Sequence, residues 1–252
     1  MEQEQILEIA LQIGSTLLQY GAETYRVEET IKRICDSYDL NCEPFAFTTG
    51  VFASAKVEKG ISTVFKRISS RKVDLTKIAR LNALSRRIQR EKPDYKEIKE
   101  ELDDILKCKT YSYGAFALSF AFTASVYAYL FGGSYTDAFA ALIVGILLGL
   151  IHPVFAGNSS LFPFIQYFAD GFAAGILSSV ASILIPLTDV YIVIIGALTN
   201  LLPGVALTNG VRDLLHGDNI SGVTRLGEAF IVVAVLAFGA GIGLSLWNLG
   251  GF

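Results

Sequence analysis

Basic residues are almost missing from the second half of this 252-residue chain. Of its 21 lysines and arginines, 19 come before residue 110, and only Arg212 and Arg225 follow. Only six of the 24 acidic residues follow as well. A charged side chain costs about 2.5–3.5 kcal/mol at the centre of a bilayer, so long stretches that exclude charge indicate membrane spans. The chain therefore divides near Lys109 into a charged domain and an apolar domain.

Other absences exclude several classes of protein. Its three cysteines (Cys35, Cys42 and Cys108) lack CxxC spacing, and neither histidine has a neighbouring ligand set, so we expect reduced thiols and no metal site. A net charge of −3 offers no electrostatic case for nucleic acid. No GxSxG, Walker A, HExxH or GxGxxG motif is present, so we predict no enzyme and no cofactor. The acidic N-terminus does not resemble a secretory signal peptide.

Residues 1–109 are predicted to form a small cytosolic α+β domain. Apolar residues recur at helical spacing from Ile6 to Leu17. Further helices are expected over 22–37, 74–90 and 95–106, and strands over 43–48, 51–57 and 61–68. Asp74 is a candidate helix cap. The tripeptide Glu58-Lys59-Gly60 predicts a hairpin turn, because glycine adopts positive φ at little cost.

Residues 110–252 are predicted to form an all-α membrane bundle of about five helices. A bilayer core about 30 Å thick needs roughly 20 helical residues. The predicted spans are 113–131, 136–152, 161–185, 190–207 and 229–247, and His152-Pro153 stops the second. If the N-terminal domain is cytoplasmic, the positive-inside rule places the loop from Arg212 to Arg225 in the cytoplasm too. Five spans then leave the C-terminus outside.

Most acidic residues of the apolar domain have a structural explanation. Asp137, Asp189 and Glu228 come at predicted helix N-termini, where a carboxylate accepts from free N–H groups. Asp170 differs, because it lies about nine residues, or roughly 13 Å, into the third span. An acid at such depth is a functional hypothesis by default. It could relay protons, contact a substrate ammonium group, or serve as a hydrogen-bonded structural acid.

Small and helix-breaking residues mark packing faces and a break. Three pairs of glycines four residues apart predict close helix packing: Gly145/Gly149, Gly171/Gly175 and Gly239/Gly243. Asn200 and the Pro203-Gly204 pair predict either a kink or a broken helix, which transporters use to bind ions and zwitterions. The run Asn158-Ser159-Ser160 fits a re-entrant turn or an ordinary loop.

Two stretches carry a resemblance to a known family. One is Tyr20-Gly21-Ala22-Glu23-Thr24-Tyr25-Arg26-Val27-Glu28, and the other runs from Pro203 through Asn209-Gly210-Val211-Arg212-Asp213 to Gly217-Asp218 and Arg225. Both resemble the threonine/serine exporter family, and the resemblance covers essentially the whole chain. It implies a secondary exporter of small amino acids in the cell (inner) membrane, driven by the proton or membrane gradient. Longer members resemble this chain fused to a second, smaller five-helix unit, so it looks like the large, N-terminal-half subunit of a split pair.

The resemblance and the polar membrane residues together define the candidate sites and partners. Candidates for substrate binding or proton coupling are Asp170, Asn200, Pro203, Gly204, Thr208 and Asn209. Candidates for a cytosolic gate are Gly21, Glu23, Thr24, Arg26, Glu28, Arg212, Asp213, Gly217, Asp218 and Arg225. The expected partners are membrane lipid, a small-molecule substrate, and a small five-helix membrane subunit or further copies of the chain.

Three other functions compete with amino-acid export. They are export of a small dicarboxylate such as succinate, a membrane-anchored ligand sensor, and a membrane-embedded enzyme. Polar groups at mid-membrane favour transport, because a mere anchor needs none of them.

Overall fold

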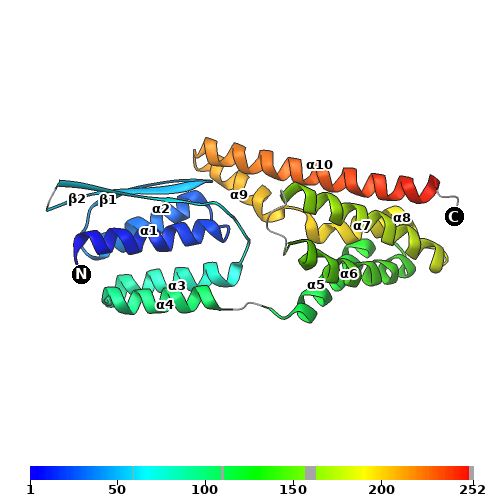
Figure 1. Ribbon diagram of the computed structural model, residues 1–252, viewed down its shortest axis with the longest axis horizontal. Helices are drawn as coiled ribbons and strands as arrows, with labels where there is room; N and C mark the ends of the chain where they lie inside the picture. The colour runs from blue at the N-terminus through cyan, green and yellow to red at the C-terminus, as the bar shows by residue number, and fades with distance from the viewer. Residues whose placement is uncertain (59, 109–110, 157–162, 250–252) are drawn as a thin grey trace. The chain divides into compact units, whose positions relative to one another are not determined.

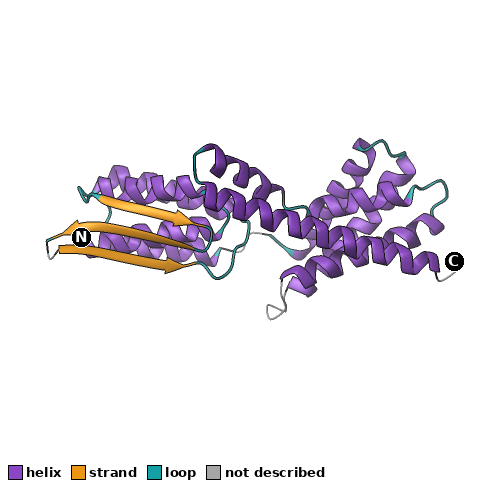
Figure 2. Ribbon diagram, turned by 90° about the horizontal axis from the view of Figure 1, so that it is seen from above, coloured by secondary structure: helices purple, strands orange, loops and turns teal. Residues whose placement is uncertain are grey.

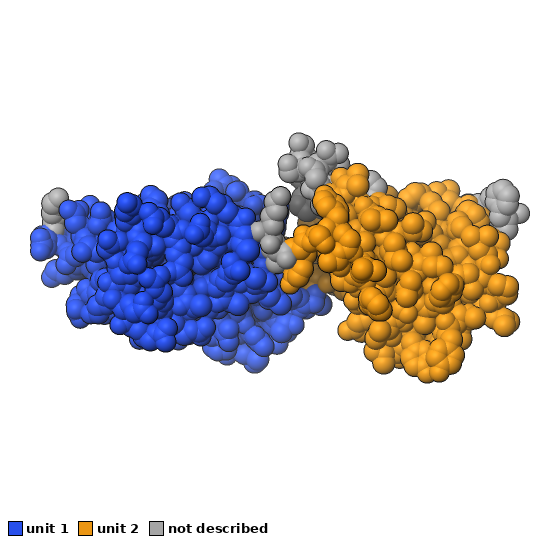
Figure 3. Space-filling model, turned by 90° about the horizontal axis from the view of Figure 1, so that it is seen from below, with its two compact units in different colours: residues 1–110, 204–227 blue, residues 111–203, 228–252 orange. Residues whose placement is uncertain are grey.

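The chain folds into two compact units, which Figure 3 colours separately. A computed structural model describes residues 1–58, 60–108, 111–156 and 163–249. Unit 1 comprises residues 1–110 and 204–227, and unit 2 comprises residues 111–203 and 228–252. The last helix, α10 (Asn219–Leu249), contributes its first residues to unit 1 and the remainder to unit 2.

Unit 1 is a three-layer α+β structure. Its helices are α1 (Gln3–Gln19), α2 (Thr24–Ser37), α3 (Leu75–Glu91), α4 (Tyr95–Lys107) and α9 (Gly204–Leu215). Its strands β1 (Cys42–Phe47), β2 (Gly50–Val57) and β3 (Gly60–Arg67) form an antiparallel sheet in the order β1-β2-β3. Figure 1 shows the sheet on one side of α1 and α2, with α3 and α4 on the other side. The helices and strands predicted for the first domain are confirmed.

Helix α1 is the centre of the unit 1 core. Because layers cover it on both sides, its apolar residues are buried almost all round the helix, and Ile9, Ile13 and Leu18 have no exposed surface. Each such side chain contributes roughly 1.5–3 kcal/mol on burial. The Asp74 carboxylate accepts from the Lys77 N–H at 3.0 Å, so the predicted cap of α3 is confirmed.

Unit 2 is built from helices that are apolar enough to cross a membrane. They are α5 (Tyr113–Leu130), α6 (Tyr135–Ala156), α7 (Pro163–Leu184), α8 (Val190–Leu198) with the 3-10 turn Thr199–Leu201, and the remainder of α10. Among the described residues, α5, α6, α7 and α10 pass as single spans. Helices α8 and α9 together would be a fifth, broken one. The expected bundle of about five spans therefore agrees with four or five.

Three predicted helix boundaries were wrong. Helix α6 continues through Pro153 to Ala156, so this proline lies in the last turn of the helix and does not end it before that turn. The fourth segment is not one helix over 190–207, since α8 ends at Leu198. Helix α10 begins at Asn219 and not at 229, because nothing in that polar stretch breaks a helix. Glu228 therefore lies inside α10 and does not cap it.

The other two predicted caps are confirmed. Asp189 accepts from the Tyr191 N–H at 2.9 Å at the start of α8. Asp137 accepts from the Ser134 N–H at 2.7 Å and from the Asp189 N–H at 2.6 Å, so it also ties two turns together. The turn residue Lys59 and the run Asn158-Ser159-Ser160 lie outside the described residues.

Glycines let the helices of unit 2 approach backbone to backbone. A Cβ added at Gly171 or Gly175 would collide with the carbonyl oxygens of Leu236 or Ala240 on α10. One added at Gly239 would collide with the Phe168 carbonyl on α7. The predicted packing role of these pairs is confirmed.

The α7–α10 contact yields a stability prediction. Replacing Gly171 by Ala forces the two backbones apart, and overpacking of this kind costs about 1–3 kcal/mol. The matched control is Gly241→Ala on α10, where an added Cβ meets nothing within 4 Å. Thermal unfolding in detergent should show a lower midpoint for Gly171→Ala and an unchanged or higher one for Gly241→Ala. Equal midpoints would show that the contact is not tight.

Candidate functional site

The first motif stretch forms the turn between α1 and α2. Gly21 has φ +95°, a conformation that favours glycine. The Gly21 and Ala22 N–H groups donate to the carbonyls of Leu18 and Leu17 at 3.1 and 3.0 Å. This is a Schellman motif, and it ends α1. The carbonyls of Gly21 and Ala22 are then free to accept from other elements.

The second motif stretch ends α9 in the same way. Gly217 has φ +87°, and the N–H groups of Gly217 and Asp218 donate to Leu214 and Asp213 at 3.0 and 2.9 Å. The Asp218 carbonyl accepts from the Gly222 N–H as α10 begins. Each motif stretch is thus a tight glycine turn between two helices.

The turn after α1 binds side chains of α9 and α10 within unit 1. Asn209 Nδ2 donates to the Gly21 carbonyl at 2.7 Å, and Arg225 Nη2 donates to the Ala22 carbonyl at 2.8 Å. The Thr24 N–H donates to Asp213 Oδ1 at 3.2 Å. We call the following eight residues the motif cluster: Gly21, Ala22, Glu23, Thr24, Asn209, Arg212, Asp213 and Arg225. Residues about 190 positions apart in the sequence therefore form one site.

A buried ion pair lies at the centre of the motif cluster. Arg225 Nε lies 3.0 Å from Asp213 Oδ2, and the two side chains are 5% and 0% exposed. Asp213 also faces the N-terminus of α2, where the helix dipole favours a negative charge. Removing one partner of such a pair typically costs 3–5 kcal/mol, because the other charge stays buried and uncompensated.

The rim of the cluster is more exposed. Arg212 Nη1 donates to Glu23 Oε1 at 2.6 Å, and the Arg212 side chain is half exposed. Arg26 Nε lies 3.7 Å from Glu23 Oε2. Burial opposes ionisation of Glu23, but hydrogen bonds from the backbone and Arg212, with the charges of Arg26 and Arg212, lower its pKa overall. Glu23 is therefore a stable anion between two arginines.

Glu28 extends the cluster toward the sheet. Its Oε1 accepts from the Ala46 N–H on β1 at 2.8 Å. Burial raises the pKa of Glu28, and the Asp218 and Asp213 carboxylates raise it further, against the effect of that hydrogen bond. Glu28 therefore holds a proton above its ordinary pKa range.

Unit 2 holds a second candidate site, an acid–histidine pair. His152 Nδ1 on α6 lies 2.9 Å from Asp170 Oδ2 on α7. Asp170 is completely buried, and its other oxygen, Oδ1, has no hydrogen-bond partner among the described residues. Gln166 Nε2 lies 3.4 Å from the same imidazole nitrogen. The acid stands about 10 Å from the described start of α7.

The packing of α6 on α5 positions His152. Gly145, Gly149 and His152 share one face of α6, and a Cβ on Gly145 would lie 2.7 Å from the Phe120 carbonyl oxygen. The rings of Phe116 and Phe120 lie 6.0 and 5.8 Å from the imidazole. From the 3-10 turn after α8, Asn200 Nδ2 donates to the same Phe120 carbonyl at 3.0 Å. The imidazole is thus held between aromatic rings and Asp170.

Three predicted site residues, Thr208, Pro203 and Gly204, belong to neither site. The Thr208 hydroxyl donates to the Gly204 carbonyl of its own helix and is exposed. Pro203 and Gly204 lie at the break before α9. Asn209 belongs to the motif cluster and not to the acid–histidine pair. In the described part of the chain, no group of three His, Cys, Asp or Glu residues could hold a metal ion.

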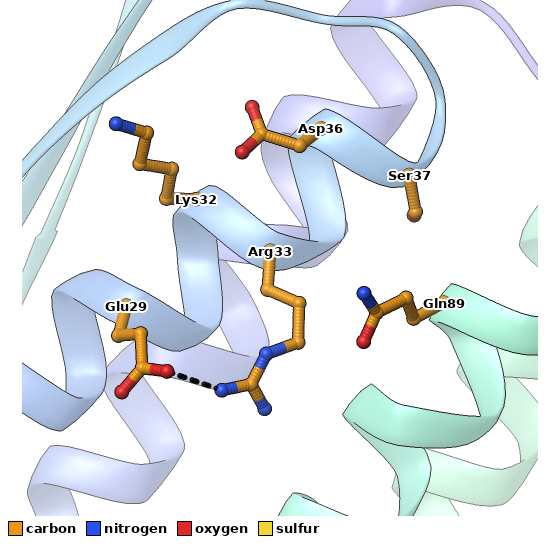
Figure 4. Close-up of a pocket in the computed structure, with 6 residues that line it drawn as sticks. All are labelled: Glu29, Lys32, Arg33, Asp36, Ser37 and Gln89. Atoms are coloured by element: carbon orange, nitrogen blue, oxygen red, sulfur yellow. Dashed lines mark hydrogen bonds and ion pairs between the residues drawn. The ribbon is translucent and has the colours of Figure 1, made fainter.

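A shallow polar pocket lies between α2 and α3 (Figure 4). Its volume is about 300 Å³, and its lining residues are Glu29, Lys32, Arg33, Asp36, Ser37 and Gln89. Glu29 and Arg33 pair with each other at 2.6 Å, and the Glu29 side chain is 62% exposed. A pocket whose charges are solvated and already paired offers little binding energy to a ligand.

Sequence reasoning missed His152 as a partner of Asp170. The two residues are 18 positions apart on different helices, so no local sequence pattern connects them. One signal was present: His152 continues the Gly145/Gly149 spacing, which places it on the face that packs inside the bundle.

Comparison with known proteins places the chain in a family. A model of the ThrE family, described as "Putative threonine/serine exporter", matches residues 8–247. The chain belongs to the threonine/serine exporter family. Both motif stretches and the acid–histidine pair lie within the matched region. No solved structure matches the chain.

Several proteins with different names match nearly the whole chain. An uncharacterized protein of Schizosaccharomyces pombe is 24% identical over 97% of this chain and 30% of its own length. A "Threonine/serine exporter" of Corynebacterium glutamicum is 24% identical over 96% of this chain and 51% of its own length. A "Probable succinate transporter subunit YjjP" of Klebsiella aerogenes is 21% identical over 100% of this chain and 97% of its own length.

The relatives differ in length, and the bacterial ones are all named for transport. This chain spans about a third to a half of the yeast protein and the exporter, but nearly all of the succinate transporter subunit. The bacterial relatives are named for transport and not for catalysis. The chain thus combines membership of the exporter family with four or five helices that are apolar enough to cross a membrane.

The buried ion pair yields the second prediction. Asp213→Asn keeps the side-chain size and an acceptor for the Thr24 N–H, but it removes the carboxylate charge that lies 3.0 Å from the buried Arg225 guanidinium. We expect a loss of about 3–5 kcal/mol in the free energy of unfolding, measured by denaturant titration in detergent. Arg212→Gln is the control, because exposed pairs contribute about 0–1 kcal/mol. Similar losses for both variants would contradict the role assigned to the buried pair.

Glu28 yields a prediction about pH. Because its pKa is raised in the folded state, the folded chain binds this proton more tightly than the unfolded chain does. Stability from Glu28 is therefore present at low pH and is lost as the pH rises through the raised pKa. Glu28→Gln retains the acceptor for Ala46 and removes the titration. The variant should be at least as stable as the wild type at pH 7, and its advantage should shrink as the pH falls through the raised pKa of Glu28 and be gone below about 4. A constant difference at all pH values would rule out this account.

Proposed function

We propose that this protein is the large subunit of a secondary exporter that moves small amino acids such as threonine or serine out of the cytoplasm in exchange for protons. The observation that carries the proposal is the acid–histidine pair. Asp170 is fully buried in unit 2, with one oxygen on His152 and the other without a partner among the described residues. Family membership supports transport, and the pair supports proton coupling.

The physical argument is that a buried carboxylate must be compensated. An isolated charge in a low-dielectric interior is costly, so the unpartnered oxygen favours a bound proton or a donating ligand. The ammonium group of an amino acid is such a donor. Proton and ammonium compete for one carboxylate, because binding the ammonium requires the ionised form. This competition is the physical basis of exchange.

The orientation follows from the distribution of charge. Unit 1 contains the N-terminal domain together with Arg212 and Arg225, the two late basic residues. The positive-inside rule therefore supports a cytoplasmic N-terminal domain, with the loop between Arg212 and Arg225 on the same side. With α8 and α9 as one broken span, five spans put the C-terminus outside. The connection from α6 to α7 is then cytoplasmic, and the acid–histidine pair stands about two helical turns from that side.

The motif cluster is then a cytosolic gate. It holds the turn after α1 against the ends of α9 and α10 through the buried Asp213–Arg225 pair. Since α9 belongs to the broken span and α10 to a continuous one, the cluster controls the inner ends of two spans. Asn200 and the break before Gly204 supply the flexible point that such a gate needs.

The partner is a small five-helix membrane subunit. The exporter from Corynebacterium glutamicum is about twice as long as this chain, and the Klebsiella aerogenes relative of equal length is named as a subunit. Five spans followed by five more would place the second unit inverted in the membrane. Inverted repeats with a site between them are a recurring transporter design.

A small dicarboxylate such as succinate is the second candidate substrate. The name of the Klebsiella aerogenes relative favours it. The chemistry at Asp170 favours an amino acid, because a carboxylate repels a dianion unless Asp170 and His152 are both protonated.

Asp170→Asn tests the coupling role. The variant should export labelled threonine from vesicles about tenfold more slowly or worse, because a hydrogen bond to a charged group contributes about 1.5–3 kcal/mol. Its remaining flux should not depend on the pH gradient. Asp189→Asn, which alters only a helix cap, is the control.

The vesicles are tested with and without a co-expressed small membrane subunit, and with labelled succinate in parallel. Flux of succinate without threonine would favour the second candidate. No gradient-dependent flux of either compound in any combination would refute transport. Unchanged flux and pH dependence in Asp170→Asn would remove Asp170 from the mechanism.

A further inference from the structure

One face of the unit 1 sheet is covered by helices, and the opposite face is apolar and open. Phe45, Phe52 and Phe65 lie directly opposite one another in the register of β1, β2 and β3. They are 56%, 38% and 47% exposed. Figure 2 shows the strands in front of the unit 1 helices, with no described helix of unit 1 over them.

The rings on this face form one continuous layer. The Phe52 ring lies 4.4 Å from Phe65 and 5.9 Å from Phe47, and Phe47 lies 6.1 Å from Phe45. Gly50 makes room for them, because a Cβ there would lie 2.7 Å from the Phe65 ring. We call these four phenylalanines the aromatic face. A contiguous exposed apolar patch of this kind marks an interaction site more often than a solvated surface.

We propose that the aromatic face binds the aromatic face of a second copy of this chain, around a two-fold axis parallel to the strands. A two-fold interface requires a self-complementary surface. The row Phe45–Phe52–Phe65 is symmetric about the central strand, so Phe52 meets its own copy and Phe45 meets the partner copy's Phe65 position. The same rotation places Arg67 over the ring at position 47 of the other copy.

The charged residues of this face support a second copy over other occupants. By strand alternation the face also carries Glu43, Lys56 and Arg67, so it holds both signs of charge. The rotation brings Glu43 of one copy within side-chain reach of Lys56 of the other, and it sets Arg67 on an aromatic ring, a favourable cation–π arrangement. An anionic lipid surface would favour a face without Glu43.

The size of the face explains why the contact needs the membrane. Three strands of about eight residues cover roughly 380 Å² per copy at the standard spacings of strands and residues. Two copies bury about 800 Å², which is below the 1,200 Å² of a stable soluble complex. Copies anchored in one membrane meet at a much higher effective concentration, so a weak contact suffices. This proposal does not depend on what the protein transports.

Thiol cross-linking of the full chain in its native membrane tests the pairing. Packed sheets lie about 10 Å apart, so a bismaleimide of that length is needed instead of a direct disulfide. Phe52→Cys should cross-link to itself. Differently tagged Phe45→Cys and Phe65→Cys chains should cross-link to each other when co-expressed, and Phe45→Cys alone should do so at least fivefold less. The wild type, with its native cysteines, and Lys99→Cys on the exposed side of α4 set the background.

The outcomes separate the occupants of the face. Cross-linking of Phe52→Cys no greater than that of Lys99→Cys would overturn the proposal. So would self-linking of Phe45→Cys without linking to Phe65→Cys, because it requires a different axis. Quenching of a probe at position 52 by labelled lipid, without cross-links, would assign the face to the membrane instead. Phe52→Lys gives a second measurement: it should abolish the dimer by mass analysis in small lipid discs while unit 1 keeps its circular dichroism.

Discussion

A carboxylate taken out of water needs a counter-charge, and two acids in this chain meet that need in opposite ways. Asp213 has a permanent cation, Arg225, and a backbone N–H, so both of its oxygens are compensated. Asp170 has an imidazole that can gain or lose a proton, and one oxygen without a partner among the described residues. The first acid is paired with a permanent cation, although burial raises the pKa of Asp213, and the second is paired with a histidine, which carries no fixed charge. The same residue type is therefore structural in unit 1 and functional, as proposed, in unit 2.

The tight turns in the two motif stretches depend on the same backbone conformation. Gly21 and Gly217 each take a positive φ at the end of a helix, and each is followed by the start of another helix. Because a Schellman turn satisfies the last carbonyls of its own helix, the turn residues are free to bind elsewhere. The carbonyls of Gly21 and Ala22 accept from Asn209 and Arg225 for that reason. Two sequence stretches almost 190 residues apart thus specify one site.

Local patterns predicted the secondary structure of the first domain and three of four helix caps, because these features depend on neighbours in the sequence. The start of α10 was missed, since hydropathy marks where a helix is apolar and not where it begins. The Asp170–His152 contact was missed because it depends on how α6 and α7 pack. The glycine pairs predicted close packing correctly, but periodicity could not show that Gly171 and Gly239 face the same helix pair.

Helices α7 and α10 meet through bare backbone at Gly171, Gly175, Gly239 and Gly243. With no side chains between them, the pair has no rotamers to rearrange and little freedom to roll or separate. Any motion that alternates access to Asp170 must therefore carry α10 along with α7 as one body. If Asp170 exchanges ligands as proposed, the surface along which α7 and α10 move lies where α7 meets α6, at the contact between Asp170 and His152.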